Sequence, residues 1–521
     1  NVLGGVTGDI TGNVLGDVIG NVLGGVAGDV TGDVLGNVLG GVTGDVTGDV
    51  LGNVLGGVTG DITGDVLGNV LGGVTGDIDA NVITTNGDII VAGNIVVSGG
   101  EITANVTGSS VLIDATLLDA FGRLKVSNPY TLLDEKFLSG PRNDAWDTLT
   151  EGTGSFAHVS GAGHNTMSVT TSGDRVVRQS RLYVPYQPGK GLTIFATGTL
   201  ETSGGVTDVI SRIGLFDDGN DKIPEDTSGS NGYFFELDGT ALNVVQRTDV
   251  TGSVVETRIP QSSWNYDTFD GTGPSGITLD PSKRQIFVFE LEWLGVGTAV
   301  TGFFINRSLK IAHIFYHANR DSAIPYISRP TLPVRYEIIS TGGAATMTQI
   351  CSTAISDGGY DPKGRVYADG KQSGEQISIS TSEVPLAAYR LRDNYRRVLI
   401  NVMSVSAFSQ SGGNFVLRVY HIPAPAVDPL TGGTWRDVNA SYSAVEINTT
   451  PTAVTLTNSV KVDEIYVVNQ SRNSFAGTDD RFGLQLTSDI QGNTDVVVIT
   501  GETFSGTVNN VSAASQWQEF E

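Results

Sequence analysis

Apolar residues recur at every fourth position over the first 76 residues of the chain. These residues form nineteen consecutive tetrads, in which the second residue is always Val or Ile and the fourth is always Gly, from Gly4 to Gly76. The block NVLGGVTGDVTGDVLG begins at Asn37 and recurs, nearly unchanged, from Asn21, Asn53 and Asn69. A four-residue unit is therefore nested in a sixteen-residue one, and a fixed period of this kind indicates a repeat architecture.

The tetrad pattern excludes collagen and the α-helix. Collagen has glycine at every third residue, and glycine costs a helix interior about 1 kcal/mol relative to alanine. An even, Val-rich period favours extended chain. Two forms stay open: a strand whose second and fourth positions share one face, and a solenoid with one tetrad per side and glycine at the corner.

A single copy of this repeat has little apolar surface with which to stabilise itself. One buried Val contributes about 1.5–3 kcal/mol, whereas ordering four residues costs about 1–2 kcal/mol each. We therefore expect residues 1–80 to form a shaft shared by identical chains, as a homotrimer, with the glycines where backbones approach closely. The alternative is a flexible linker, but such linkers favour Gly and Ser, and Ser is absent before Ser98.

After the shaft, residues 81–131 predict a shaft end and a neck. Short apolar runs alternate here with turn signals such as Asn86-Gly87 and Gly93-Asn94. Residues 115–121 predict a short helix that is closed by Gly122. This neck connects the repeat to two regions that have a different pattern.

Residues 132–370 have the dense alternating pattern of a large β-domain. In the segment Gln285–Trp293, the side chains of Phe287, Phe289, Leu291 and Trp293 share one face. Further strands are expected at residues 192–196, 233–237, 302–305 and 334–339. This pattern predicts an antiparallel sandwich, lectin-like or jelly-roll in outline.

Residues 371–521 predict a second, smaller β-sandwich. Residues 371–384 read as a polar connection. The expected strands then cover residues 397–406, 414–420, 464–468, 482–487 and 495–500. The predicted fold class is thus all-β, with a glycine-rich β-fibre or solenoid shaft followed by two antiparallel sandwiches.

Several motifs resemble those of one known family. They are DAFGRLKVSNPYTLLDEKF (residues 119–137), IGLFDD (213–218), NGYFFEL (231–237), DGTGPSGITLD (270–280), WLGVG (293–297) and RPTLPVRYEI (329–338). With them the chain resembles bacteriophage virion fibre proteins, especially marine or cyanophage-like ones, over about half of its length. The resemblance implies a structural fibre protein of the tail or capsid, on the virion surface, and it brings no catalytic residues.

The charge of the chain narrows the range of partners. The net charge is −25, and residues 1–122 carry fourteen acidic residues and no Lys or Arg. Contacts to phosphates need basic patches, so no nucleic-acid partner is expected.

No segment resembles a signal peptide or a membrane span, so no membrane insertion is expected. Asn1 lies inside the repeat, which is compatible with a native chain that starts further upstream. Cys351 has no disulfide partner and is expected to be a small buried hydrophobe.

Two sets of acidic residues suggest cation binding. Asp217, Asp218, Asn220 and Asp221 surround Gly219, and hard oxygen ligands in a tight turn can hold Ca²⁺. The EF-hand spacing is not met, and a solvated acidic turn is the favoured interpretation. In the shaft, Asp29, Asp45 and Asp61 recur sixteen residues apart, and their stacking would raise pKa values or recruit cations. Solvated carboxylates are again the favoured interpretation, so no cofactor other than this possible Ca²⁺ is expected.

Two further groups resemble parts of catalytic sites. Glu290 and Glu292 share a strand face, and glycoside hydrolysis needs two carboxylates at a defined separation; an exposed acidic face is the favoured interpretation. His313 and His317 lack the HExxH pattern of zinc proteases and are expected to be structural or surface histidines. We therefore predict that the protein is not an enzyme.

The predicted function is a phage fibre that projects two sandwiches for attachment to a host-surface glycan. Exposed aromatic side chains are expected at Trp264 and Tyr266. The partners would be further copies of the chain, other virion proteins at the N-terminal end and the host receptor. The alternatives are a polysaccharide-degrading tailspike, a capsid decoration or cement protein, and a bacterial surface adhesin.

Overall fold

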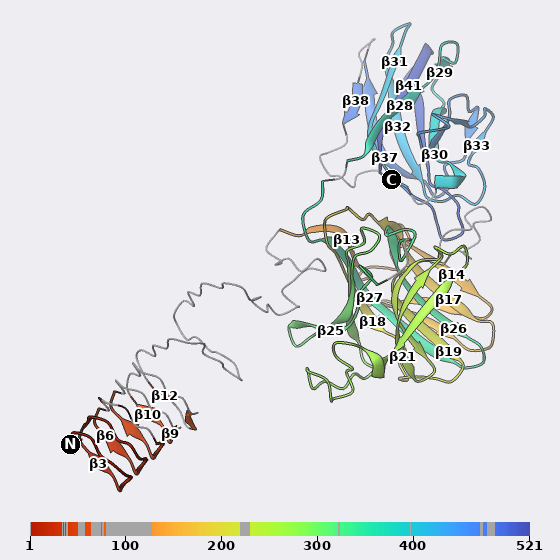
Figure 1. Cartoon of the computed structure of the whole chain (residues 1–521). Helices are drawn as coiled ribbons and strands as arrows, with labels where there is room; N and C mark the ends of the chain where they lie inside the picture. Colours follow the sequence, from red (N-terminus) through yellow and green to blue (C-terminus); the bar gives the residue numbers. More distant parts are fainter. Residues whose placement is uncertain are drawn as a thin grey trace. The chain divides into compact units, whose positions relative to one another are not determined.

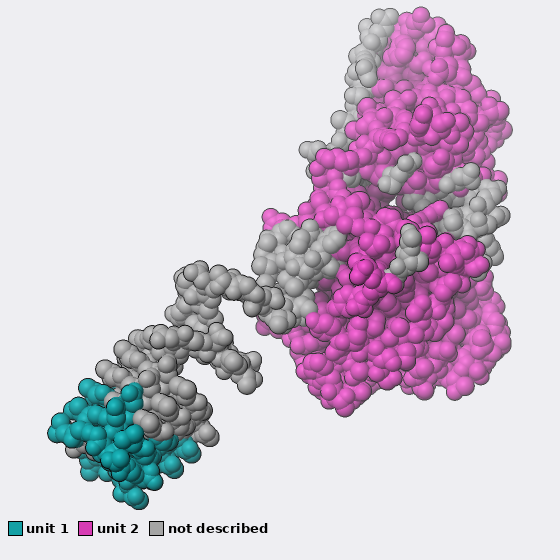
Figure 2. Space-filling view, viewed as in Figure 1, with its two compact units in different colours: residues 1–111 teal, residues 112–521 magenta. Residues whose placement is uncertain are grey.

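The structure of the chain is a computed structural model (Figure 1). It describes residues 2–33, 35, 37, 40–49, 58–63, 74–75, 78–79, 128–218, 230–320, 324–361, 363–395, 398–468, 473–476 and 485–520. The chain divides into two compact units, residues 1–111 and 112–521 (Figure 2). The predicted helix at 115–121 lies outside the described residues. Among the described residues the chain is all-β, apart from the short 3₁₀ turns Gln261–Ser263 and Asp393–Tyr395.

The described part of the first unit consists of two-residue strands in short parallel sheets. One sheet has the order β11-β9-β7-β5-β2, a second has the order β12-β10-β8-β6-β3, and β1 pairs with β4. The strands are β1 (Val2–Leu3), β2 (Ile10–Thr11), β3 (Val14–Leu15), β4 (Val18–Ile19), β5 (Val26–Ala27), β6 (Val30–Thr31), β7 (Val42–Thr43), β8 (Val46–Thr47), β9 (Val58–Thr59), β10 (Ile62–Thr63), β11 (Val74–Thr75) and β12 (Ile78–Asp79). Every pair joins residues sixteen apart, for example Val14 with Val30 and Val30 with Val46. Successive sixteen-residue blocks of the same chain therefore lie on one another in register.

The tetrad positions have distinct surroundings in this arrangement. Second-position side chains point inward: Val18, Val26 and Val46 are each 1% exposed. Third-position side chains point outward, and Leu3 and Leu23 are 76% and 55% exposed. The alternation within each two-residue strand thus separates a narrow apolar interior from the surface.

Fourth-position glycines lie where the backbone of the preceding block comes closest. A Cβ added at Gly40 would lie 2.5 Å from the backbone nitrogen of Gly25. At Gly44 it would lie 2.6 Å from the carbonyl carbon of Gly28, and the φ of +146° favours glycine as well. The prediction that the glycines face crowded positions is confirmed here. The crowding comes from an earlier block of the same chain.

First-position side chains connect the blocks through hydrogen bonds. The amide of Asp45 donates to Oδ1 of Asp29 over 3.0 Å, and the amide of Asp61 donates to Oδ1 of Asp45 over 2.9 Å. In the same way, the backbone amide of Asp29 donates to the side-chain oxygen Oδ1 of Asn13. These carboxylates therefore satisfy backbone donors of the next block, a role that their spacing alone does not indicate.

The first sandwich, which begins at β13, has two antiparallel sheets. The first sheet has the order β15 (Ser155–Val159), β16 (His164–Val169), β27 (Ala345–Ser356), β18 (Leu192–Thr199), β23 (Gln285–Leu291), β24 (Ala299–Ile305) and β25 (Ser308–Phe315), with β13 (Tyr130–Lys136) paired to β27. The second has the order β14 (Trp146–Glu151), β17 (Arg175–Val184), β26 (Leu332–Ser340), β19 (Val209–Phe216), β20 (Gly232–Asp238), β21 (Ala241–Thr248) and β22 (Val255–Pro260). Aromatic side chains fill the space between the sheets, and Phe235 lies 4.6 Å from Phe303 and 5.7 Å from Trp264 between ring centroids. The predicted antiparallel sandwich is confirmed.

The second sandwich also has two antiparallel sheets. The first has the order β28 (Arg365–Gly370), β41 (Val508–Phe520), β31 (Leu399–Ser409) and β38 (Asn473–Ala476), with β29 (Ile377–Ile379) on β41 and β39 (Gln485–Leu486) on β31. The second has the order β34 (Arg436–Asp437), β35 (Val445–Asn448), β30 (Val384–Leu391), β40 (Val496–Thr503), β32 (Phe415–Ile422) and β37 (Val460–Val467). A small two-stranded sheet joins β33 (Leu430–Thr431) to β36 (Ala453–Val454).

In the second sandwich, a strand near the start of the domain pairs with the last strand of the chain. Because β28 pairs along β41, residues 365–370 belong to this sandwich. The expected polar connection at 371–384 contains the strand β29. No helix in the described part of the chain is long and apolar enough to cross a membrane.

Candidate binding cleft between the sandwiches

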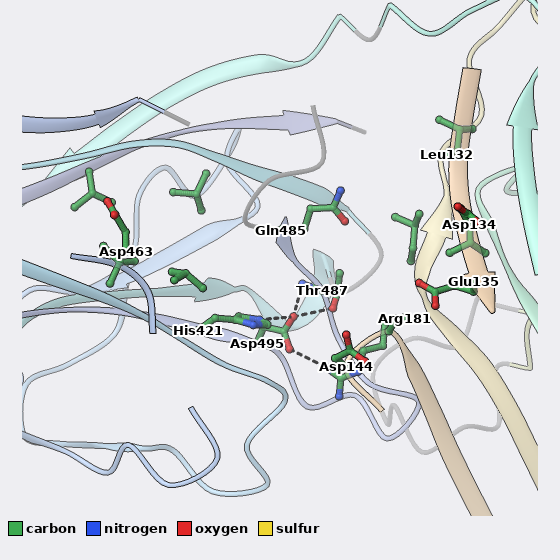
Figure 3. Close-up of a pocket in the computed structure, with 17 residues that line it drawn as sticks. Leu132, Asp134, Glu135, Asp144, Arg181, His421, Asp463, Gln485, Thr487 and Asp495 are labelled. Carbon is green, nitrogen blue, oxygen red and sulfur yellow. Dashed lines mark hydrogen bonds and ion pairs between the residues drawn. The ribbon is translucent and has the colours of Figure 1, made fainter. Parts of the chain in front are cut away.

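A cavity of about 610 Å³ lies where the two sandwiches of the second unit meet (Figure 3). Its lining draws on β13, β17, β31, β32 and β37 and on the segments around β39 and β40. The polar lining residues are Asp134, Glu135, Asp144, Arg181, His421, Asp463, Gln485, Thr487 and Asp495. The apolar ones are Leu132, Leu133, Ala145, Leu182, Val402, Val405, Val419 and Val462. A ligand in this cleft would meet hydrogen-bonding groups and aliphatic surface together.

Asp495 is the central acceptor of the cleft, and its side chain is 1% exposed. Its Oδ2 accepts hydrogen bonds from the amide of Thr487 over 3.0 Å and from Oγ1 of Thr487 over 2.7 Å. Nε2 of His421 lies 3.2 Å from the same oxygen, and the three groups converge in Figure 3. Burial alone would raise the pKa of Asp495, but the bond to His421 and the charge of Arg181 hold that pKa below its usual value. Asp495 is thus an ionised group in close contact with His421.

Arg181 joins the two sandwiches through two carboxylates. Its Nη1 donates to Oδ1 of Asp495 over 3.1 Å, and its Nε donates to Oδ1 of Asp147 over 2.9 Å. Oδ2 of Asp147 in turn accepts the amide of Ile490 over 3.0 Å. Burial raises the pKa of Asp147 to about 6, although the charge of Arg181 opposes that shift. These bonds, with the packing of Leu149 and Val177 on Ile490, hold the two sandwiches together beside the cleft.

Two carboxyl groups on the first-sandwich side of the cleft have opposite pKa shifts. Arg142 lies between them, with Nη1 3.3 Å from Oε2 of Glu135 and Nε 3.0 Å from Oδ1 of Asp144. Burial raises the pKa of Glu135, whereas the hydrogen bond from Arg142 lowers the pKa of Asp144. Carboxyl oxygens of both groups can accept hydrogen bonds from a hydroxylated ligand.

The predicted calcium residues are only partly within the described chain. Asp217 is 2% exposed, and its Oδ1 accepts the amide of Asn231 over 2.9 Å. Asp218 pairs with Arg175 over 2.9 Å. Asn220 and Asp221 lie outside the described residues. The calcium site stays a prediction, and Asp217 and Asp218 already have protein partners.

Of the two predicted binding aromatics, only one reaches solvent. Trp264 is 5% exposed, donates from Nε1 to the carbonyl of Ile259 over 3.1 Å and packs against Phe235. Tyr266 is 44% exposed. The expectation of an exposed Trp264 is corrected, because its ring completes the core of the first sandwich.

Glu290 and Glu292 are also placed differently from the expectation. They are 4% and 0% exposed, so the interpretation as an exposed acidic face is wrong. Glu290 lies on β23 opposite Thr193 of β18 and Val300 of β24. Neither residue lines the cleft.

The two histidines and the cysteine have structural surroundings. His317 is stacked on Tyr326 at 3.8 Å between ring centroids, and its Nε2 lies 3.1 Å from the hydroxyl of Tyr233. Nδ1 of His313 accepts the amide of Asn265 over 3.2 Å, and burial lowers the pKa of His313 to about 4. The structural interpretation of both histidines is confirmed, whereas Cys351 is only partly buried. No group of three or more metal-binding side chains occurs among the described residues.

Comparison with known proteins gives distant structural similarities only. No protein-family model matches the chain, and no curated protein sequence matches it. A protein of unknown function from Shewanella oneidensis MR-1 aligns with 49% of this chain and 100% of its own, at 8% identity and a TM-score of 0.30. A legume lectin-like domain from Entamoeba histolytica covers 43% of this chain and 96% of its own, at 8% identity and a TM-score of 0.26.

A third similar structure is an enzyme. An endo-1,3-beta-glucanase from Streptomyces sioyaensis aligns with 44% of this chain and 97% of its own, at 11% identity and a TM-score of 0.29. Similarities at this level assign neither a ligand nor an activity to the present chain. The cleft and the repeat are therefore the features of this chain that bear on its function.

Proposed function

We propose that this chain is a structural fibre protein of a bacteriophage virion, displayed on the virion surface, whose sandwiches bind a host-surface glycan. The proposal combines the family resemblance of the motifs with the stacked repeat and the cleft. Two of the motifs fall on strands that flank β19 in one sheet of the first sandwich, 231–237 on β20 and 329–338 on β26. Other virion proteins would hold the N-terminal end of such a fibre.

The cleft carries the binding part of the proposal. Its volume of about 610 Å³ falls within the range of about 300–1,000 Å³ that is common for ligand sites. A sugar has apolar C–H faces and a rim of hydroxyls that both donate and accept hydrogen bonds. The aliphatic side chains of Leu182 and Val462, which are partly exposed, suit those faces. Asp463 and Gln485 suit the hydroxyls. Each site would bind weakly, and several copies on one fibre would raise the apparent affinity.

A binding experiment on the full chain tests this proposal. Gln485→Ala and Asp463→Ala should each weaken binding to purified host lipopolysaccharide or capsule by about tenfold, since each removes a polar contact, and a tenfold loss corresponds to about 1.4 kcal/mol. Biolayer interferometry with immobilised polysaccharide measures the effect. Lys283→Ala, an exposed residue that does not line the cleft, should bind normally. A chain that binds no host polysaccharide would favour a decoration or cement role.

The enzyme alternative has one specific observation behind it. Glu135 and Asp144 share a cleft and have opposite pKa shifts, which is how glycosidases separate an acid from a base. We propose binding without hydrolysis, so a reducing-end assay on the same polysaccharides should stay negative. Release of saccharide that is lost in Glu135→Gln would identify a tailspike-like hydrolase.

We further propose that the stacked blocks form a solenoid shaft and that three copies associate along it. When the sixteen-residue blocks are counted from residues 1, 17, 33, 49 and 65, the third positions of the first two tetrads are apolar in nine of ten cases. The other two tetrads of each block carry mainly Thr at this position. The nine residues are Leu3, Ile19, Leu23, Leu35, Leu39, Leu51, Leu55, Leu67 and Leu71. Two adjacent apolar sides allow each copy to contact two neighbours, which closes a ring under cyclic symmetry. At roughly 100 Å² per side chain, they would bury on the order of 900 Å² per copy, or about 450 Å² at each of its two contacts. Each contact is therefore about half of the roughly 800 Å² per partner of a standard interface, and the closed ring makes three such contacts together.

The association can be tested with matched leucine variants. Size-exclusion chromatography with light scattering should give the mass of three chains for the full protein. Leu23→Thr combined with Leu35→Thr should shift the mass toward the monomer, because both side chains are exposed on the apolar sides. Leu15→Thr is the control, since Leu15 is 83% exposed but belongs to a Thr-rich side. A full chain that is monomeric at all concentrations would contradict the trimer.

A further inference from the structure

Two exposed aromatic rings are stacked on each other on the second sandwich, apart from the cleft. Tyr466 lies on the edge strand β37, and Phe504 follows β40. Their ring centroids are 6.0 Å apart, the ring planes differ by only 12°, and the residues are 54% and 66% exposed. Neither ring lines the cleft. Large aromatic side chains in contact with one another and with solvent are unusual on a protein surface that has no partner.

The strand register explains why Tyr466 faces outward. Its cross-strand partner on β32 is Val416, whereas the next residue along, Ile465, pairs with the fully buried Leu417. Successive side chains of a strand point to opposite faces, so Tyr466 lies on the face turned away from the core. Val416 is nevertheless 1% exposed, and it also pairs with Glu502 of β40. Tyr466 therefore lies on the outer face of a sheet, beside the paired strands β32 and β40.

A network of charged groups lies along the same face beside the rings. The hydroxyl of Tyr466 donates to Oε1 of Glu464 over 2.9 Å. Oε2 of Glu464 accepts from Nε of Arg418 over 2.9 Å and from Nζ of Lys461 over 2.7 Å. Arg418 also pairs with Glu502, and its side chain is 18% exposed. The network places hydrogen-bonding groups of both charges beside the exposed faces of the stacked ring pair.

We propose that Tyr466 and Phe504 form a stacking platform for a pyranose ring of a glycan, with Arg418, Glu464 and Glu502 binding its hydroxyls. A hexose with equatorial hydroxyls has a flat C–H face for the rings and a hydroxyl rim for the charged groups. A nucleobase could stack as well, but its phosphates would meet a chain of net charge −25. The proposal rests on glycan binding as the proposed function, and it adds a second site on a different face.

Titration of the full chain with cellohexaose, mannohexaose and N-acetylchitohexaose, followed by saturation-transfer NMR and calorimetry, tests the platform. Tyr466→Ala and Phe504→Ala should each weaken binding of the preferred hexaose by about tenfold, as expected for the loss of an aromatic anchor. Tyr466→Phe keeps the ring and should bind within about threefold of the unsubstituted chain. Tyr442→Ala is the matched control, because Tyr442 is also on this sandwich and is 63% exposed.

The outcomes separate the platform from the proposed function. Normal binding by both alanine variants, or no binding of any hexaose by the unsubstituted chain, would overturn the platform. If host polysaccharide binding is lost in Gln485→Ala but kept in Tyr466→Ala and Phe504→Ala, the glycan function stands and the platform fails. A change of oligomeric mass in Tyr466→Ala would show instead that these rings are a contact between copies.

Discussion

Replacement of Gly40 by alanine should break the stacking of the sixteen-residue blocks around residue 40. The new Cβ would lie 2.5 Å from the nitrogen of Gly25 and 2.7 Å from the carbonyl carbon of Gly24, both backbone atoms. A backbone cannot swing aside like a flexible side chain, so the cost should reach or exceed the roughly 1–3 kcal/mol of an overpacked core. Hydrogen exchange on the full chain should show loss of protection at the amides of Val22 and Val26, which donate to the carbonyls of Asn37 and Gly41 across the disturbed contact.

Gly5→Ala is the control for this variant. Neither glycine has a left-handed φ, and a Cβ at Gly5 would meet only the carbonyl of Asn21, at 3.7 Å. The control should therefore be neutral or slightly stabilising, because alanine restricts the unfolded chain. Unchanged amide protection in Gly40→Ala would mean that the blocks do not stack in this register.

The sequence alone predicts what each position of the repeat does, but it does not identify the neighbour. Strict Val and Gly spacing places Val18 inside and Gly44 at a close approach. The same spacing would suit strands from several chains, because one apolar anchor per tetrad is compatible with either assembly. The sixteen-residue register makes the neighbour an earlier block of the same chain. In this register the carboxylates of Asp29 and Asp45 accept hydrogen bonds from backbone amides of the next block, a role that spacing alone could not indicate.

In the sandwiches, the alternation of apolar and polar residues predicts the strands and their core faces well. It does not predict whether the opposite face of a strand is buried or exposed. The apolar residues of β23 correctly indicate its core face, with Phe287 and Phe289 at 1% and 2% exposed. The pattern contains no information on what covers the other face, so the burial of Glu290 and Glu292 could not be foreseen. The cleft is harder still, because Arg181 and Asp495 are 314 residues apart and no local motif links them.

Replacement of Glu337 by alanine should strongly destabilise the first sandwich. Glu337 and Arg335 are both fully buried on β26. Oε1 of Glu337 accepts from Nε of Arg175 over 2.7 Å, and Oε2 lies 3.4 Å from Nη1 of Arg212. Removal of this carboxylate leaves buried guanidinium groups without their shared partner, and breaking a buried pair costs about 3–5 kcal/mol. Urea denaturation of the full chain, followed by near-ultraviolet circular dichroism, should show a loss of that size.

The stability that Glu337 provides should also disappear in acid. Burial by itself would raise the pKa of Glu337, but the charges of Arg335, Arg175 and Arg212 outweigh it and hold the pKa well below the ordinary 4.5. The folded state then holds fewer protons than the unfolded state below about pH 4.5, so stability is full above that pH and falls as the pH drops toward the folded pKa. Glu337→Gln should lose this part of the pH dependence.

Glu151→Ala supplies the matched control, because Glu151 pairs with the same Arg175 but is 38% exposed at a distance of 3.7 Å. An exposed pair contributes about 0–1 kcal/mol, so this variant should unfold near the midpoint of the unsubstituted chain. Equal losses for Glu151→Ala and Glu337→Ala would contradict the argument, because burial would then not set the strength of the network. A loss confined to Glu337→Ala, with a flattened acid profile in Glu337→Gln, would establish that the buried carboxylate shared by these guanidinium groups contributes most to the stability of the network.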